Sequence, residues 1–176
     1  MDWMKLKSKL FLLASVVLCF SFSGCRIHYD MSGAVLGDAK TVNVEYFANS
    51  PGATLAKPTY SSTLTEALKD ILTSQTSLNL SGRGADLQFE GQVTGYAVSP
   101  VAIQSGTDIA SFNRLTITVS VKFTNTKNEK MNFEQTFSRY ADYPSASSLN
   151  QVEDALIKTI DDQLVQDIFN KALINW

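Results

Sequence analysis

RLTITVSVKFT, residues 114–124, is the clearest strand signal in this chain. Apolar and polar residues alternate along it: Leu115, Ile117, Val119, Val121 and Phe123 fall on one side, and Thr116, Thr118, Ser120 and Lys122 on the other. A period of two is typical of a strand in a sheet with one buried and one solvated face. The stretch therefore predicts a sheet with a core face and a polar face.

The segment that follows this strand predicts a hairpin. Residues 125–129 have the polar composition of a turn. Residues 130–140 then form the second strand, whose inner face would carry Met131, Phe133, Gln135 and Phe137. Residues 141–147, with Pro144, are expected to break the pattern.

The segment before residue 114 predicts a longer strand over residues 86–98. Its inner face would carry Leu87, Phe89, Gly91 and Val93. Gly91 and Gly95 are candidate bulge or close-approach points. Pro100 is expected to end the strand, and residues 101–113 are expected to form a loop too long for a tight turn.

The N-terminal part of the domain adds two strands and a loop. Residues 40–47 predict a half-buried strand with Val42, Val44 and Tyr46 on one side. Residues 48–60 have the composition of a loop, and residues 77–80 predict a short strand that Gly82-Arg83-Gly84 breaks.

Two helices are predicted from capping boxes and apolar periodicity. Thr63 and Glu66 have the spacing of a capping box, and a helix is expected to run to about Ser74 on the apolar face Leu64, Ala67, Leu68, Ile71 and Leu72. Ser148 and Gln151 offer a second box. It begins a stripe of about seven turns, roughly 37 Å long at 1.5 Å per residue, made of Leu149, Val152, Leu156, Ile160, Leu164, Ile168 and Leu173.

The order of these elements predicts the fold class. It is an α+β two-layer sandwich, with two helices packed on one face of a mainly antiparallel (mixed) sheet of four to five strands. The first helix is long enough to link two parallel strands, since such a crossover needs a dozen or more residues.

The N-terminus has the plan of a secretory signal. Lys5, Lys7 and Lys9 precede an apolar run over residues 10–22, which is shorter than the roughly 17 to 25 residues that cross a bilayer. Ser23-Gly24-Cys25 then resembles a bacterial lipoprotein signal, in which the cysteine is acylated and becomes the mature N-terminus. An ordinary secretory signal with a cysteine near its cleavage site is the alternative. We expect a removed signal (residues 1–24), a lipidated flexible tether (25–38) and one α+β domain (39–176).

Charge and cysteine usage exclude several classes of function. Of the 176 residues, the first 24 hold three lysines and one aspartate, so the mature chain would carry a formal charge of about −4. This balance does not favour a nucleic-acid-binding protein. Cys19 would leave with the signal and Cys25 would carry lipid, which leaves no disulfide, thiolate nucleophile or cysteine metal site.

No catalytic residue, metal site or cofactor is predicted. The only histidine, His28, lies in the expected tether, which lacks the rigid surroundings that catalytic and metal sites need. The acidic pairs Glu153-Asp154 and Asp161-Asp162 are interpreted as a solvated helix face rather than as paired catalytic carboxylates. Gly82-Arg83-Gly84 is a turn rather than a phosphate loop.

Four basic residues lie on or near the predicted hairpin: Arg114, Lys122, Lys130 and Arg139. Such a strip could contact phosphates or sugar acids of a glycolipid, where arginine makes planar bidentate contacts. A plain surface charge is the alternative for each residue. Tyr140 and Tyr143 could add contact area or cap the core.

Several segments together resemble the lipopolysaccharide-assembly lipoprotein family LptE. They follow the lipoprotein-type Cys25 and are VEYF (44–47), LTEALKD (64–70), DLQFEG (86–91), NRLTITV (113–119) and FNKALINW (169–176). The resemblance implies two helices against a small sheet. It also implies an outer-membrane lipoprotein that sits as a plug in a large β-barrel translocon, LptD-like, helps that barrel fold and assists lipopolysaccharide delivery to the outer leaflet. It implies no reaction and assigns no lipopolysaccharide-contacting residue in this sequence.

Analogy also suggests an address. Arg26, after the lipidated cysteine, is not the aspartate that holds some lipoproteins at the inner membrane, and no acidic cluster follows Cys25. We expect a lipid-anchored protein on the periplasmic side of the outer membrane. The alternative function is a lipid-tethered periplasmic module that binds a glycolipid or glycan through the basic hairpin, without a barrel partner.

Overall fold

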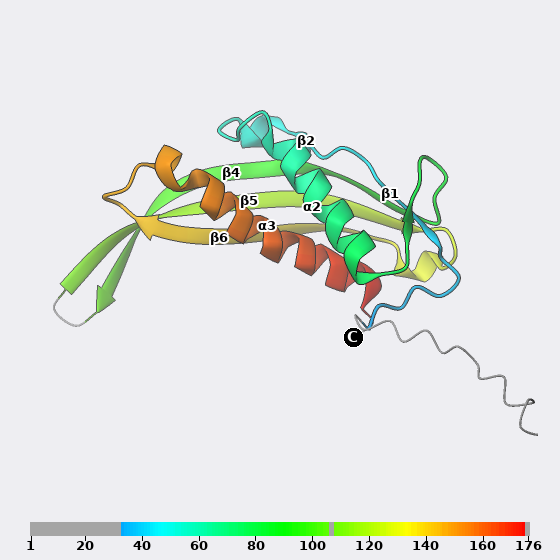
Figure 1. The fold of residues 1–176 in the computed structure, drawn as a ribbon. Coiled ribbons are helices and arrows are strands. Elements are labelled where there is room, and N and C mark those ends of the chain that lie inside the picture. Colours follow the sequence, from blue (N-terminus) through cyan, green and yellow to red (C-terminus); the bar gives the residue numbers. More distant parts are fainter. Residues whose placement is uncertain (1–32, 106–107, 175–176) are drawn as a thin grey trace, which may run out of the picture.

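The computed structural model describes residues 33–105 and 108–174, and they form two helices on one face of a mixed sheet (Figure 1). The strands are β1 (Thr41–Val44), β2 (Ala48–Asn49), β3 (Asn79–Leu80), β4 (Leu87–Ser105), β5 (Asp108–Asn125) and β6 (Phe133–Pro144). The helices are α2 (Tyr60–Gln75) and α3 (Leu149–Leu173), with single 3-10 turns η1 (Pro51–Ala53) and η2 (Glu129–Met131). The predicted fold class is confirmed, with six strands where four to five were expected.

The sheet order is β3-β1-β4-β5-β6, and β2 also pairs with β4. β4, β5 and β6 form an antiparallel meander, while β1 is parallel to both β3 and β4. Helix α2 therefore links two parallel strands, as its length allowed. None of the helices described in this structure is long and apolar enough to cross a membrane.

The core lies between the helices and the sheet. The alternation predicted for residues 114–124 is present: Leu115, Ile117, Val119, Val121 and Phe123 are at most 1% exposed. They meet the helical residues Leu64, Leu68, Leu72, Ile160, Leu164 and Ile168, each fully buried. Burying an aliphatic or aromatic side chain of this size is worth about 1.5–3 kcal/mol, so this layer dominates the stability of the domain.

The predicted strand over residues 40–47 is interrupted. Val44 lies opposite Phe89 and Ala48 lies opposite Gln92, so four steps along this chain match three along β4. The extra residue reverses the side-chain alternation. Phe47 is consequently fully buried while Tyr46, expected on the inner face, is 58% exposed. The Phe47 N–H donates to the Thr65 hydroxyl of α2 at 3.1 Å.

The prediction of a loop at residues 101–113 is wrong. β4 and β5 continue as a paired ribbon through Pro100↔Asn113 and Val101↔Phe112 to Ser105↔Asp108. Proline lacks an N–H donor, but among the described residues only β5 pairs with β4 beyond Val93. Pro100 therefore lies where no second described strand needs that donor.

Other element boundaries also differ from expectation. Strand β6 starts at Phe133 rather than near residue 130 and ends at Pro144, and the predicted inner residue Gln135 is exposed. Helix α2 begins at Tyr60, so Thr63 is not its cap; the Thr63 hydroxyl donates to the Thr59 carbonyl instead. The capping box at Ser148 is confirmed, and the Ser148 N–H donates to Gln151 Oε1 at 3.2 Å.

The start of the domain is fastened to the end of α3. Of the tether expected over residues 25–38, the structure describes 33–38, and the Val35 N–H donates to the Leu173 carbonyl at 2.6 Å. Cys25, Arg26 and His28 lie outside the described residues. The domain boundaries and the lipidated tether stay predictions.

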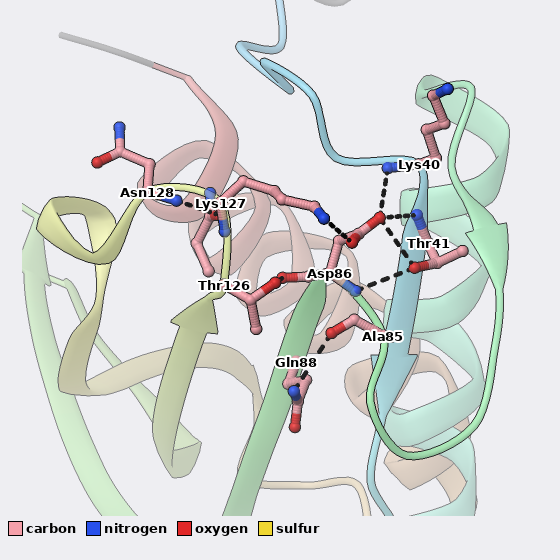
Figure 2. A network of polar contacts seen from close by, with 9 residues as sticks. Lys40, Thr41, Ala85, Asp86, Gln88, Thr126, Lys127 and Asn128 are labelled. Atoms are coloured by element: carbon pink, nitrogen blue, oxygen red, sulfur yellow. Dashed lines mark hydrogen bonds and ion pairs between the residues drawn. The ribbon is translucent and has the colours of Figure 1, made fainter.

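Asp86 joins three segments at this end of the sheet (Figure 2). Its Oδ2 accepts from the backbone N–H of Lys40 at 2.9 Å and from the Thr41 N–H and hydroxyl at 3.2 and 3.0 Å. Its Oδ1 pairs with Lys127 Nζ at 2.9 Å. Asp86 thereby ties the start of β1 to β4 and to the β5–β6 turn.

We expect Asp86→Asn to lower the melting temperature at pH 7. The hydrogen bonds that the carboxylate accepts hold the pKa of Asp86 well below its usual range, and the bond from the Lys40 N–H has the largest effect. A lowered pKa in the folded state stabilises the protein above about pH 4, and this stabilisation is lost as the pH falls. Melting curves between pH 7 and pH 3 should therefore show a weaker acid dependence in the variant. Identical acid dependence of the two proteins would contradict this role.

Candidate functional site

The face of the sheet opposite the helices, here called the open face, is polar along its central strands. Its central row is the polar side of β5, from Thr116 to Lys122. Register places Gln88, Glu90 and Gln92 of β4 and Glu134, Thr136 and Ser138 of β6 beside it. Thr118 Oγ1 and Ser138 Oγ lie 3.0 Å apart, which forms a hydroxyl pair in the middle of this face.

Arg114 lies on the open face but is already paired. Its Nε and Nη2 donate to the two carboxylate oxygens of Asp142 at 2.7 and 2.8 Å, and its guanidinium carbon lies 3.6 Å from the centre of the Tyr140 ring. This bidentate bond lowers the pKa of Asp142. Any anion that binds Arg114 must therefore compete with Asp142 or use the remaining guanidinium donors.

Lys122 lies at the other end of the same row, roughly 26 Å from Arg114 at 3.3 Å per strand residue. Its Nζ is 3.2 Å from Glu90 Oε2, and Glu134 is its register partner on β6. A shallow depression of about 340 Å³ surrounds it, lined also by Glu45 and Tyr46. The surroundings of Lys122 are therefore more acidic than basic.

The other two basic residues lie elsewhere. Arg139 is opposite Ile117 in register, and its Nε and Nη2 donate to Asp167 of α3 at 2.5 and 2.8 Å. Lys130 is in the turn η2. The structure thus brings Arg114 and Lys122 onto one face and separates both from Arg139. A role of these four residues in ligand or partner contact stays a prediction.

Strands β4 and β5 extend beyond the body of the domain, and Figure 1 shows this two-stranded extension projecting past the helices. We call it the arm: residues Ser99–Ser105 and Asp108–Asn113. β6 ends at Pro144, opposite Phe112, so farther out the two strands of the arm pair only with each other in the part of the chain that the structure describes. Residues 97–105 of the arm and its base contain no charged residue. Val101 and Phe112 form an apolar cross-strand pair at its root.

Two carboxylates of α3 are buried rather than solvated, which corrects the interpretation of the acidic pairs. Glu153 is 4% and Asp161 is 3% exposed. Tyr96 donates to Glu153 Oε1 at 2.5 Å, and Tyr60 donates to Asp161 Oδ1 at 2.6 Å. Asp154 and Asp162 do lie in solvent, with side chains 91% and 66% exposed. Burial is the main cause that raises the pKa of both tyrosines.

A sequence signal for this burial exists. Glu153, Ile157, Asp161 and Val165 recur every four residues and form a second row beside the apolar stripe of α3. Because residues four apart lie on one helix face, Ile157 and Val165 indicate that the row points inward. The acidic pairs considered alone do not indicate that Glu153 and Asp161 are buried.

We expect Asp161→Asn to stabilise the domain at pH 8. Burial, helped by the negative charge of Asp162 and opposed by the Tyr60 bond, raises the pKa of Asp161 to about 6. A raised folded-state pKa means that stability falls as the pH rises from about 4 to 6, because the folded protein holds the proton more tightly. Asparagine stays neutral and still accepts from Tyr60, so the free energy of unfolding should rise by up to about 3 kcal/mol.

Urea unfolding at pH 4 and pH 8 measures this. The exposed neighbour supplies the control, since Asp162→Asn should change stability by less than about 0.5 kcal/mol. Destabilisation of Asp161→Asn at pH 8 would show that the charged Tyr60 bond outweighs the burial of the carboxylate.

Within residues 33–105 and 108–174, no group of three or more histidine, cysteine or acidic residues is placed to hold a metal ion. Gly82-Arg83-Gly84 forms the turn that leads into β4, with a positive φ of 89° at Gly84.

Comparison with known proteins gives one family. The family model described as "LptE: Lipopolysaccharide-assembly" matches residues 39–172. No curated protein matches the chain significantly.

Comparison with solved structures finds matches at low sequence identity. A putative neuraminyllactose-binding hemagglutinin homolog from Helicobacter pylori is 11% identical, with a TM-score of 0.53; the match covers 84% of this chain and 89% of that one. A minor lipoprotein from Acinetobacter baumannii is 19% identical over 77% of this chain and 97% of its own, with a TM-score of 0.49. Uncharacterized lipoprotein B from Nitrosomonas europaea is 15% identical over 83% and 88%, with a TM-score of 0.47.

Proposed function

The chain belongs to the lipopolysaccharide-assembly family LptE, and we propose that it is a lipid-anchored partner of a large outer-membrane β-barrel. In this proposal the domain packs inside or against an LptD-like translocon on the periplasmic side and assists the transport of lipopolysaccharide to the outer leaflet. The role involves no reaction, and Cys25 supplies the anchor.

The main support for the proposal is that the open face and the arm are not covered by the two helices. The helices cover one side of the sheet and leave a continuous hydrogen-bonding surface, rich in threonine, serine and glutamine, on the other. The inner wall of a large barrel is polar, because its strands alternate between lipid-facing and lumen-facing residues. Hydroxyl and amide side chains can bond such a wall without burying unpaired charges.

The arm supports the same proposal. An isolated two-stranded hairpin is marginally stable in water, so an extension with two strands and few charges gains most from being packed against a partner. It continues directly from the open face, because β4 and β5 are common to both. One partner could therefore contact both surfaces.

The anchor follows separately. A single acyl chain binds a membrane only marginally, whereas a doubly or triply acylated cysteine gives a stable attachment. Lipidation at Cys25 would hold the domain at the membrane that contains the barrel.

The test is recovery of a barrel with a tagged protein from detergent-solubilised membranes, with one variant on each face. Thr118→Arg places a long cation at the centre of the open face and should lower recovery of the barrel roughly tenfold, equivalent to about 1.4 kcal/mol. Thr159→Arg makes the same change on the solvent side of α3 and should leave recovery unchanged.

Equal recovery of the barrel with both variants would exclude the open face as the contact. Recovery of lipopolysaccharide without any barrel, abolished by charge reversal at Arg114 and Lys122, would favour the lipid-tethered glycan-binding module instead.

A further inference from the structure

A cleft of about 500 Å³ lies between α2 and α3, on the helical side of the molecule and apart from the open face. Tyr60, Ala67 and Ile157 form its apolar walls. Thr63 and Asp70 contribute from α2, and Asp161 contributes from α3. Neither the proposed barrel contact nor lipid anchoring uses this cleft.

The lining is strongly acidic. Five carboxylates, Glu66, Asp70, Asp154, Asp161 and Asp162, face two lysines, Lys57 and Lys158. Both lysines already have carboxylate partners: Lys57 pairs with Glu153 and Asp154 at 3.0 and 2.6 Å, and Lys158 pairs with Asp162 at 3.2 Å. Glu66 pairs with Lys69 at 2.8 Å. Asp70 and Asp161 are the two lining carboxylates with no ion pair in the part of the chain that the structure describes.

Asp161 is the unusual member of this group. The residue is 3% exposed, its Oδ1 accepts from Tyr60, and its Oδ2 has no hydrogen-bond partner among the described residues. A buried polar atom without a partner costs about 1–3 kcal/mol. The cost applies to both protonation states of Asp161, because the ionised Oδ2 lacks a hydrogen-bond donor and the protonated Oδ2 lacks an acceptor. Asp161 lines the cleft but its Oδ2 is itself covered, so a donor in the cleft bonds this oxygen once the side chain turns toward it.

The residues that line the cleft indicate which kind of cation it would bind. The carboxylates of the described residues are not arranged as a metal site, so a divalent cation is disfavoured. An organic cation fits both features, since its N–H groups bond carboxylates while its methylene stem packs along apolar walls. Charge-assisted hydrogen bonds of this kind are the stronger ones in proteins.

We propose that the cleft between α2 and α3 binds an alkylammonium or guanidinium group, which donates to Asp161 Oδ2 at the floor and to Asp70 at the rim. The group could belong to a free polyamine or to a lysine or arginine side chain of a partner protein. Both sources present the same chemistry to the cleft.

The test is titration calorimetry at pH 8 on the full chain in detergent. The probes are spermidine and an end-blocked Gly-Arg-Gly peptide. At least one should bind with a stoichiometry of one, and Asp161→Asn should weaken that binding at least about tenfold, equivalent to about 1.4 kcal/mol. Glu134→Gln removes the same charge from the open face and should leave the affinity unchanged. Thermal melts verify that Asp161→Asn is folded.

Asp70→Asn keeps the test decisive if Asp161→Asn does not fold, because Asp70 is exposed and its replacement leaves the core intact. It should weaken binding about threefold. Tighter binding of spermidine assigns the site to a free polyamine, and tighter binding of the peptide assigns it to a partner side chain. The proposal is overturned if neither probe binds, if both aspartate variants bind as well as the wild type, or if magnesium chloride binds in preference to the amines.

Discussion

Replacing Gly91 by alanine is expected to destabilise the domain by about 3 kcal/mol. A Cβ at this position would lie 2.5 Å from the Ser120 carbonyl oxygen of β5 and 2.6 Å from a ring carbon of Phe47. The carbonyl belongs to the β4–β5 ladder and cannot withdraw without breaking it. The Phe47 ring is fully buried, so it has no empty space to move into.

Urea unfolding followed by circular dichroism measures the effect. Gly82→Ala is the matched control, because a Cβ there would meet nothing within 4 Å, and its stability should change by less than about 0.5 kcal/mol. A loss below about 1 kcal/mol for Gly91→Ala would show that the ring and β5 can separate, contrary to the packing described.

Replacing Phe123 by alanine is expected to cost about 4 kcal/mol. Phe123 is 1% exposed and lies at the centre of an aromatic row across β4, β5 and β6. Its ring centre is 4.8 Å from that of Phe89 and 5.4 Å from that of Phe133. Truncation removes the buried ring and leaves a cavity that these two neighbours, held on their own strands, fill only in part.

The same urea assay applies, with Tyr46→Ala as the control. Tyr46 is 58% exposed, so its loss should matter by less than about 0.5 kcal/mol. If Phe123→Ala costs no more than Tyr46→Ala, the aromatic row is not part of the stabilising core.

Much of the fold was predictable because burial on one side imposes a period that the residues carry. The alternation over residues 114–124, the hairpin that follows and the capping box at Ser148 each depend on neighbours in sequence, and all three are present. The roles of Gly91 and Gly95 were also predictable: the first is a close-approach point, and the register shifts between Val93 and Gly95.

The predictions are wrong where the local structure depends on contacts with segments far away in sequence. The extra residue between Val44 and Ala48 buries Phe47 in place of Tyr46 because Phe47 fits against Gly91, which is far away in sequence. Pro100 was expected to end β4, yet at this point the strand has only one neighbour and tolerates proline.

The candidate site was predictable only in part. A polar face could be foreseen from Thr116, Thr118 and Ser120, but the pairing of Arg114 with Asp142 and of Arg139 with Asp167 depends on strand register and helix position. The burial of Asp161 likewise depends on Tyr60, which the sequence placed in a loop. Local sequence patterns therefore predict which face of the sheet is polar. The ion pairs and the buried Tyr60–Asp161 contact depend on how distant segments pack together.

The most direct test of the proposed role is photo-crosslinking from the open face in intact cells. A photo-reactive residue at Ser120, in the central row of that face, should form an adduct with a large outer-membrane protein whose gel mobility changes on heating, as barrels do. The same residue at Thr159, on the solvent side of α3, should form none. An adduct with the barrel at Thr159 and none at Ser120, or no adduct at either position, would contradict the assignment of this domain as a barrel partner through its open face.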